Sequence, residues 1–241
     1  MSQNHEYIVC RPGGLALTEE ALSYVHAQPR CTVLDMGCGN GATLKYIKDK
    51  YDASTYGVDI SRKACEAAAK LLGSDCIFLK SAEALAFPDN FFDIVLMECT
   101  ITLFNKPEAA LAEAFRVLKK DGALIISAPS ITDSRKISAA DYAMGQSGNP
   151  LPASAKDSDK ALISGGCINI NMLKDRLNEL GFLSVNIKDC RKELTGFVAS
   201  AILNYGSISA YAQAMEEDCG GAILRDIPSK EASYSLITAK K

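Results

Sequence analysis

The stretch Val33-Leu34-Asp35-Met36-Gly37-Cys38-Gly39-Asn40-Gly41-Ala42-Thr43 decides the fold. An apolar run ends in an acid, and three glycines at alternate positions then lead into a segment with helical spacing. This order predicts a strand, a tight turn and a helix. Glycine suits a turn that needs positive φ or close approach to a ligand, and a helix N-terminus presents unpaired N–H groups. We therefore expect a ligand across this turn.

The same turn satisfies the dinucleotide-binding pattern G-x-G-x-x-G/A through Gly37, Gly39 and Ala42, and Asp59 follows at the separation expected of a ribose-binding acid. On this motif alone, an NAD-dependent oxidoreductase is an open alternative. Asp35 favours a different ligand. A carboxylate at the strand tip would repel a pyrophosphate, but it suits the cationic amino-acid end of S-adenosylmethionine (SAM).

The pattern D-x-G-x-G-x-G resembles the first motif of the class I SAM-dependent methyltransferases. In that family the glycine turn passes beneath the methionine and ribose parts of SAM, and an acid at the end of the second strand holds the ribose hydroxyls. Here the run 55–60 is a predicted buried strand that contains such an acid. The resemblance implies that the cofactor is bound by Asp35, Gly37, Cys38, Gly39, Gly41, Asp59 and Ile60.

Two later segments strengthen the resemblance. Residues 80–88 are similar to the family's adenine-side loop, D-A-E-x-L-P-F, with Ser81 in place of its Asp and Ala86 in place of its Pro. This match implies that Ala82 and Glu83 contact the cofactor. The segments F-D-x-V at 92–95 and R-V-L-x-x-x-G at 116–122 also follow the family pattern, and together with the glycine turn they disfavour the nicotinamide alternative.

The resemblance implies an α/β fold, with a Rossmann-like, seven-stranded, mostly parallel sheet, an antiparallel strand seven, helices on both faces and a helical cap. The chain is expected to form one domain over residues 1–241, with cap insertions at 130–168 and 190–230. Strand six is predicted at 183–187, and an alternating pattern predicts strand seven, as an edge strand, at 233–239.

Cap residues predict where several helices begin and end. Thr18, followed by two acids, is a candidate N-cap for a leading helix that runs to Ala27. Ser61 should cap a helix through Leu72. Asn169 should begin a helix through residue 180 that stops at a glycine. Helices are also expected near 194–204 and 207–217.

Composition bounds the partners and the compartment. The chain has 241 residues, a formal charge of −3 and no tryptophan, so neither a basic stripe nor base-stacking indoles favour nucleic acid. There is no apolar run of about 18 residues and no signal peptide at the start, which predicts no membrane partner and a cytoplasmic location. The oligomeric state is left open.

Nine cysteines are dispersed along the chain without a Cys-x-x-Cys pair, and His5 and His26 are the only histidines. This pattern does not favour a metal site. Reduced thiols in a reducing compartment are the expected state. Cys31, Cys65 and Cys76 lie in predicted core elements, where we expect small buried apolar groups.

The methyl acceptor is expected near Glu98-Cys99, at the tip of the predicted fourth strand. This turn resembles that of arsenite methyltransferases, which carry Asn-Cys here, and Ile163 to Cys167 is similar to their second cysteine segment. Glu98 and Cys99 are therefore catalytic candidates, and Glu98 is also a cofactor-binding candidate. The candidate substrate-binding residues are Tyr7, Cys10, Cys99 and Cys167, with Cys219, Asp141 and Tyr142 as further candidates for the acceptor pocket.

The sequence thus predicts a SAM-dependent methyltransferase that acts on a small molecule by in-line displacement. Alternatives are a metalloid or thiol methyltransferase that uses the cap cysteines, an NAD-dependent oxidoreductase, and a non-catalytic SAM-binding protein.

Overall fold

The computed structural model describes residues 9–132, 161–164, 166–215 and 232–241. Strands and helices alternate over the first half of the chain, as the hydrophobic periodicity predicts. The strands are β1 (Thr32–Met36), β2 (Ser54–Asp59), β3 (Ile77–Leu79), β4 (Phe92–Glu98), β5 (Leu118–Ile131), β6 (Ile163–Ser164), β7 (Cys167–Asn169), β8 (Leu183–Asp189) and β9 (Ser233–Lys240). The helices are α1 (Gly14–Tyr24), α2 (Ala42–Tyr51), α3 (Arg62–Leu72), α4 (Pro107–Val117), α6 (Ile170–Leu180), α7 (Arg191–Tyr205) and α8 (Ile208–Ala214), with short 3₁₀ turns η1 (Ser74–Cys76) and η2 (Ile101–Leu103).

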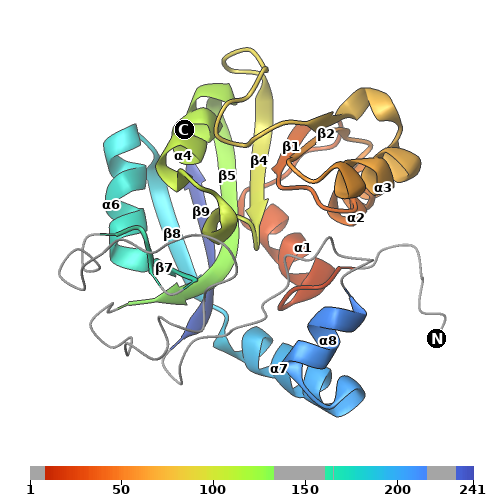
Figure 1. Cartoon of the computed structure of the whole chain (residues 1–241). Helices are drawn as coiled ribbons and strands as arrows, with labels where there is room; N and C mark the ends of the chain where they lie inside the picture. Colours follow the sequence, from red (N-terminus) through yellow and green to blue (C-terminus); the bar gives the residue numbers. More distant parts are fainter. Residues whose placement is uncertain (1–8, 133–160, 165, 216–231) are drawn as a thin grey trace.

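One twisted sheet forms the centre of the molecule (Figure 1). Strands β3, β2, β1, β4 and β5 are adjacent in that order and parallel, and β9 pairs antiparallel with both β5 and β8. This topology confirms the Rossmann-like, mostly parallel sheet. It also puts β8, rather than β9, at the edge. The residues of β9 from Ser233 to Ala239 are all buried, which an interior strand requires.

The hairpin β6–β7 is an addition to the predicted sheet. Strand β5 runs on to Ile131, whereas its pairing with β4 ends at Ser127. The backbone groups that β4 leaves unpaired are met by β7, which pairs in parallel with residues 130 and 131. The final part of the predicted insertion 130–168 therefore belongs to the sheet.

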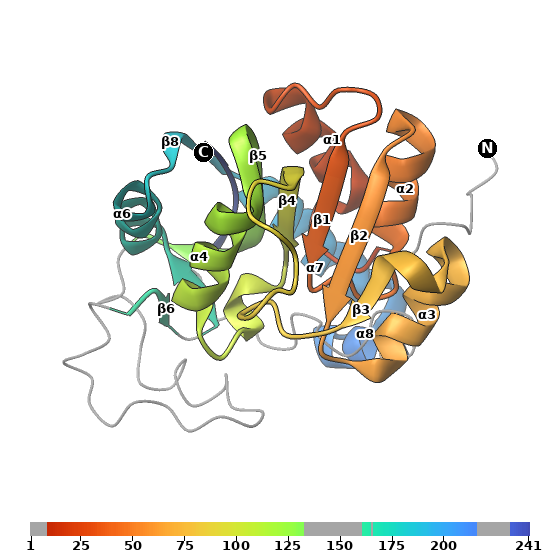
Figure 2. The same cartoon turned by 90° about the horizontal axis from the view of Figure 1, so that it is seen from above.

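Two apolar layers cover the two faces of the sheet. Helices α4 and α6 pack on one face through residues such as Leu111 and Leu173. Helices α1, α2, α3 and α7 pack on the other, through residues such as Leu22, Ile47 and Leu194. Figure 2 shows α4 and α6 on the side of the sheet opposite α1 and α2. This three-layer arrangement leaves the ends of the parallel strands available for a site.

The predicted caps are confirmed for two helices. The Ser61 side chain accepts a hydrogen bond from the backbone N–H of Ala64 at the start of α3, and Asn169 caps α6, which stops at the left-handed Gly181. The prediction for α1 was wrong. The helix begins at Gly14, directly after Gly13 in a left-handed conformation. Thr18 therefore lies buried inside the helix and does not cap it.

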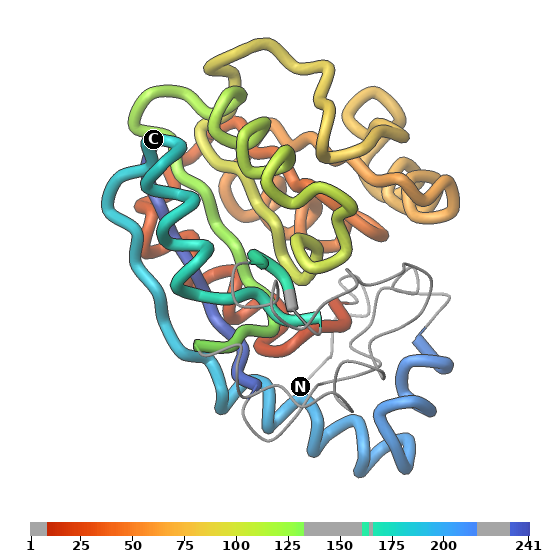
Figure 3. The backbone as a smooth tube through the Cα atoms, turned by 60° about the vertical axis from the view of Figure 1, so that its left-hand side comes forward, coloured from red at the N-terminus to blue at the C-terminus, as the bar shows by residue number. Residues whose placement is uncertain are grey.

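Helices α7 and α8 follow one another at the end of the sheet where β4 terminates (Figures 1 and 3). They pack together through the rings of Phe197 and Tyr211, whose centroids are 5.3 Å apart in an edge-to-face arrangement. Both lie within the predicted cap insertion 190–230; their role as a cap stays a prediction. Among the described residues, no helix is long and apolar enough to cross a membrane.

Candidate functional site

A cavity of about 340 Å³ lies where β1, β2 and β4 end. Its lining includes Asp35 from β1, Asp59 from β2 and Glu98 from β4, together with the glycine turn and the segment after β3. This volume falls in the range of small-molecule sites. The carboxyl ends of parallel strands are the usual place for a ligand in an open α/β sheet, so the topology and the cavity agree.

The glycine turn is shaped by three residues with positive φ, at 92° for Gly37, 53° for Gly39 and 80° for Gly41. A Cβ on Gly37 would lie 2.5 Å from the side chain of Thr100, whereas a Cβ on Gly39 would meet no atom within 4 Å. Gly37 therefore allows the β1 and β4 tips to approach each other. Gly39 keeps open the space on the cavity side of the turn, and Gly41 precedes α2 as its N-cap.

Asp35 is a buried acid at the wall of the cavity. Its residue exposure is 4%, and Oδ1 has no hydrogen-bond partner among the described residues. Burial, followed by the nearby charge of Glu98, raises the pKa of Asp35 to about 8, although Arg11 opposes the shift. A carboxylate left in this state at a cavity wall would be stabilised by a cationic ligand group.

Asp59 ties the second strand to the glycine turn. Its Oδ2 accepts a hydrogen bond from the Gly39 N–H at 3.0 Å, and its Oδ1 accepts one from the Ser61 N–H at 2.8 Å. The N–H groups of Gly37 and Cys38 donate to the Val58 carbonyl. The carboxylate is thus fixed beside the turn with lone pairs left for a ligand.

The segment after β3 forms another part of the cavity wall. Ala82 is buried, and Glu83 accepts a hydrogen bond through Oε1 from the Lys106 N–H at 2.9 Å. This contact connects the segment to the start of α4. Both residues line the cavity, as does Ile60, whose side chain is largely exposed at its rim.

Glu98 is held on both oxygens by the N-terminal part of the chain. Arg11 Nη2 donates to Oε2 at 2.6 Å, and Thr18 Oγ1 donates to Oε1 at 2.9 Å. Arg11 also donates from Nη1 to Thr43 Oγ1 at 3.2 Å, at the start of α2. Burial works against the charge of Arg11, but the attraction of Glu98 and other neighbouring groups raises its pKa. Both described hydrogen-bond partners of Glu98 are thus side chains from the segment around α1.

Cys99 follows Glu98 in an uncommon backbone conformation, with φ at 61°. Its N–H donates to the Ser127 carbonyl at 2.6 Å. The Tyr234 hydroxyl lies within hydrogen-bonding reach of the Cys99 thiol and donates to Ser127 Oγ at 3.1 Å. Burial raises the pKa of the Cys99 thiol, while the Tyr234 hydrogen bond and Arg11 oppose the rise. A left-handed non-glycine residue at a cavity wall is typical of functional sites.

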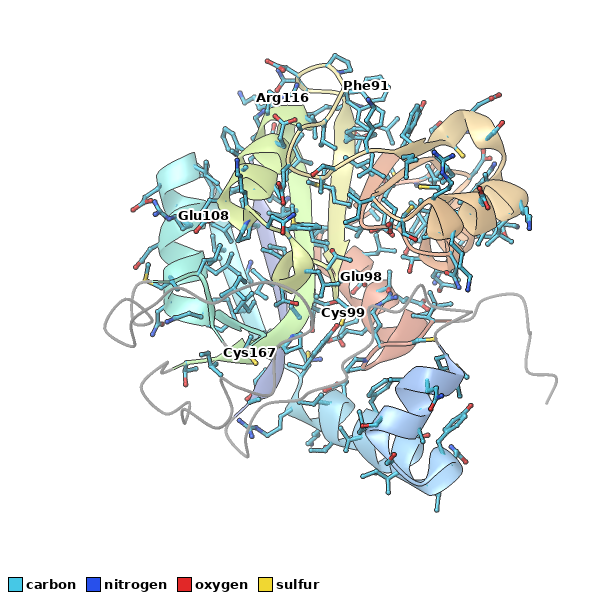
Figure 4. All side chains as sticks on the ribbon, viewed as in Figure 1. Phe91, Glu98, Cys99, Glu108, Arg116 and Cys167 are labelled. Atoms are coloured by element: carbon cyan, nitrogen blue, oxygen red, sulfur yellow. The ribbon has the colours of Figure 1, made fainter. Side chains whose placement is uncertain are left out.

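Most of the described candidate residues meet in this cavity, and two of them, Gly41 and Cys167, do not line it. Gly41 packs toward α3 behind the turn, Cys167 lies buried on β7 beside Ile131, and Tyr7 lies outside the described residues. Figure 4 shows Glu98 and Cys99 together near the end of β4, with Cys167 apart from them. The predicted residues that line the cavity are Cys10, Asp35, Gly37, Cys38, Gly39, Asp59, Ile60, Ala82, Glu83, Glu98 and Cys99.

Of the described cysteines, Cys10, Cys38 and Cys99 line the cavity, whereas Cys167 lies apart from it on β7. Cys10 is disulfide-bonded, in contrast to the reduced thiols expected, and Cys219, Asp141 and Tyr142 lie outside the described residues. Cys38 and Cys99 are the free thiols that line the cavity within the described part of the chain. In the same ranges no group of three or more His, Cys, Asp or Glu could hold a metal ion.

Sequence reasoning missed Arg11, Thr18 and Thr43. Arg11 and Thr43 line the cavity, and all three belong to the hydrogen-bond network of Glu98. Arg11 and Glu98 are 87 positions apart. No local sequence pattern relates these two residues. The one signal in the sequence is that Arg11 stands close before a pair of glycines, which indicates a turn.

Parts of the sequence are similar to known proteins. Residues 34–126 match the family model described as a methyltransferase domain. A phosphoethanolamine N-methyltransferase of Arabidopsis thaliana is 31% identical over 119 residues, which cover 48% of this chain and 24% of that protein. The corresponding Plasmodium falciparum enzyme is 32% identical over 121 residues, which cover 48% of this chain and 45% of that protein. The matches thus span less than half the length of these relatives.

The fold is also found among solved structures. Phosphoethanolamine N-methyltransferase 2 of Haemonchus contortus, in complex with SAM, superposes with a TM-score of 0.70 at 14% identity. The superposition covers 95% of this chain and 53% of that one. This likeness shows the shared fold, and residues 34–126 are similar to the methyltransferase domain family.

Proposed function

We propose that this chain, which contains a class I SAM-dependent methyltransferase domain, binds SAM in the cavity at the ends of β1, β2 and β4 and transfers its methyl group to a small-molecule acceptor. The observation that carries the proposal is Asp35. It is 4% exposed, its Oδ1 has no hydrogen-bond partner among the described residues, and it stands beside the glycine turn that Asp59 anchors. A cationic ligand group would stabilise the ionised form of such a buried acid.

Each part of SAM has a counterpart among the residues that line the cavity. Asp35 suits the ammonium group and Asp59 the ribose hydroxyls, while Ile60 and Ala82 offer apolar surface for the adenine. A Cβ on Gly39 would project into open space, so this turn leaves room for a ligand close to the backbone. These assignments follow from the family resemblance and are consistent with the contacts described above.

When bound, SAM supplies a methyl group on a sulfonium that is already a good leaving group. The chain then has to align the acceptor about 3 Å from the methyl carbon and exclude water. A general base is needed only for an acceptor that must lose a proton. Glu98 is fixed in place by Arg11 and Thr18, and Cys99, which also lines the cavity, is the other candidate for contact with the acceptor.

The relatives suggest an amine acceptor of the phosphoethanolamine kind. A phosphate group needs cationic partners, and within the described lining these are Arg11 and Lys80. Arg11 is paired with Glu98, so uncharged acceptors belong in any substrate screen as well. The metalloid alternative would need several thiols as ligands. Among the described residues of the lining the free cysteines are Cys38 and Cys99, so this alternative is the weaker proposal.

Transfer of a labelled methyl group from SAM tests the proposal. The acceptor panel contains phosphoethanolamine, a phenol, a thiol, and arsenite with glutathione. We expect label in one small-molecule class with the wild type and none with Asp35→Asn. SAM binding without transfer to any acceptor would favour the non-catalytic alternative, and NADH binding without SAM binding would favour the oxidoreductase.

A further inference from the structure

Helices α7 and α8 contain an uncharged segment that lies at the surface. Residues 194–215 include no Asp, Glu, Lys, Arg or His, and the buried residues of the two helices are Leu194, Ala201 and Ala212. Both helices lie at the margin of the molecule, beyond the end of the sheet (Figures 1 and 3). The exposed face of a helix in a globular protein usually carries charged or polar side chains. An exposed helix face without charges is therefore a candidate for contact with another molecule.

The exposed side of α7 has a projecting side chain at one end and a gap at the other. Leu203 projects, with 86% of its surface exposed. Gly196 lies two turns earlier on the same side, and a Cβ there would meet no atom within 4 Å. Ala199 and Ser200 lie between them and are small and exposed. Because helical residues three, four and seven positions apart share a side, these four residues form one surface, here called the α7 face.

We propose that the α7 face binds the α7 face of a second copy of this chain, with the two helices antiparallel about a two-fold axis. In such a contact the same surface is used on both copies and must fit itself. When the axis passes between Ala199 and Ser200, Leu203 of each copy faces Gly196 of the other. Small residues at the centre allow the helix axes to approach to about 8 Å, so each leucine side chain enters the gap at the opposite glycine.

The distribution of charge favours a second copy over a lipid surface. Charges on a surface that faces its own copy would repel each other, and the α7 face has none. In the same arrangement the exposed Lys192 of one copy faces Ser207 of the other, which directly follows the C-terminal end of α7. A cation is favoured there by the helix dipole. A helix that lies on a lipid surface needs a strongly charged side opposite its apolar side, whereas the opposite side of α7 packs on the protein through Leu194 and Ala201.

Sedimentation velocity of the full chain, at concentrations up to about 0.1 mM, measures the dimer dissociation constant. Leu203→Ala should raise this constant about 100-fold, because one leucine from each copy is lost from the contact. Gly196→Leu should raise it similarly, since its side chain fills the gap, although leucine is the better helix former at this position. The double variant Gly196→Leu/Leu203→Ala exchanges the projection and the gap and should return to within about 10-fold of the wild type. Loss of folding cannot produce this recovery.

Leu183→Ala is the matched control, because Leu183 is another exposed leucine, on β8, and this variant should keep the wild-type dissociation constant. A wild type that is monomeric at every concentration would overturn the inference, as would a dimer that Leu203→Ala leaves intact. A dimer weakened by Leu183→Ala instead would place the contact at β8. Co-sedimentation of monomeric wild type, but not of Leu203→Ala, with phosphatidylcholine–phosphatidylglycerol vesicles would assign the α7 face to a lipid surface and overturn the second-copy assignment.

Discussion

Replacing Asp35 by Asn should stabilise the ligand-free protein at neutral pH and abolish its response to SAM. Burial, with a smaller effect of Glu98, raises the pKa of Asp35 from 3.8 to about 8. Between these values the folded protein holds a proton that the unfolded chain has released. Stability from this residue is therefore complete below about pH 4 and is lost as the pH rises toward about 8.

The magnitude follows from the same shift. Each pH unit between the two pKa values removes about 1.4 kcal/mol, so Asp35 lowers the free energy of unfolding by about 4 kcal/mol at pH 7. Asn keeps the shape of the side chain without the charge. The difference in stability between Asp35→Asn and the wild type should thus grow from near zero at about pH 4 to roughly 4 kcal/mol at pH 7.

Urea unfolding at half-unit pH intervals measures this difference. Asp52→Asn is the control, because the Asp52 side chain is 83% exposed, and its curve should follow that of the wild type. Saturating SAM should reduce the pH slope of the wild type, because an ammonium beside the carboxylate lowers its pKa. Parallel pH profiles for the wild type and Asp35→Asn would show that ionisation of Asp35 does not destabilise the folded protein.

Further predictions concern the turn, the ribose acid and the thiol. Gly37→Ala should lower the free energy of unfolding by about 2–5 kcal/mol, since its φ is 92° and its Cβ would lie 2.5 Å from Thr100; thermal unfolding checks this. Gly39→Ala, with no atom within 4 Å of its Cβ, should lose only about 1–2 kcal/mol of stability but weaken SAM binding, and an unaffected SAM affinity would show that the ligand lies elsewhere. Asp59→Ala should weaken SAM binding by about 1–3 kcal/mol in calorimetry, whereas unchanged affinity would remove Asp59 from the site. Cys99→Ser should preserve cofactor affinity and abolish labelled-methyl transfer if the thiol contacts the acceptor; full activity would reduce Cys99 to a packing role.

The parts of the fold that local sequence encodes were predicted well. The strands before and after the glycine turn, the Ser61 and Asn169 caps and the stop at Gly181 each depend on a few neighbouring residues, and periodicity and turn chemistry suffice for them. The start of α1 was not predicted correctly. Its N-cap is Gly13 in a left-handed conformation, whereas the prediction relied on the side chain of Thr18.

Features that depend on long-range pairing were harder to predict. The interior place of β9 and the addition of β6–β7 follow from where β5 loses its pairing with β4, which no window of sequence contains. The same holds for the site. Asp35 and Asp59 were predicted from a motif, whereas Arg11 meets Glu98 across 87 positions and emerges only from the folded chain.

The most direct test of the account is a calorimetric titration of the wild-type chain with S-adenosylhomocysteine, which shares the adenosine and amino-acid parts of SAM and cannot donate a methyl group, alongside a titration with NADH. We expect one S-adenosylhomocysteine to bind per chain and NADH to give no heat of binding. Binding of NADH with no binding of S-adenosylhomocysteine would contradict the assignment of the cavity between Asp35 and Asp59 to SAM.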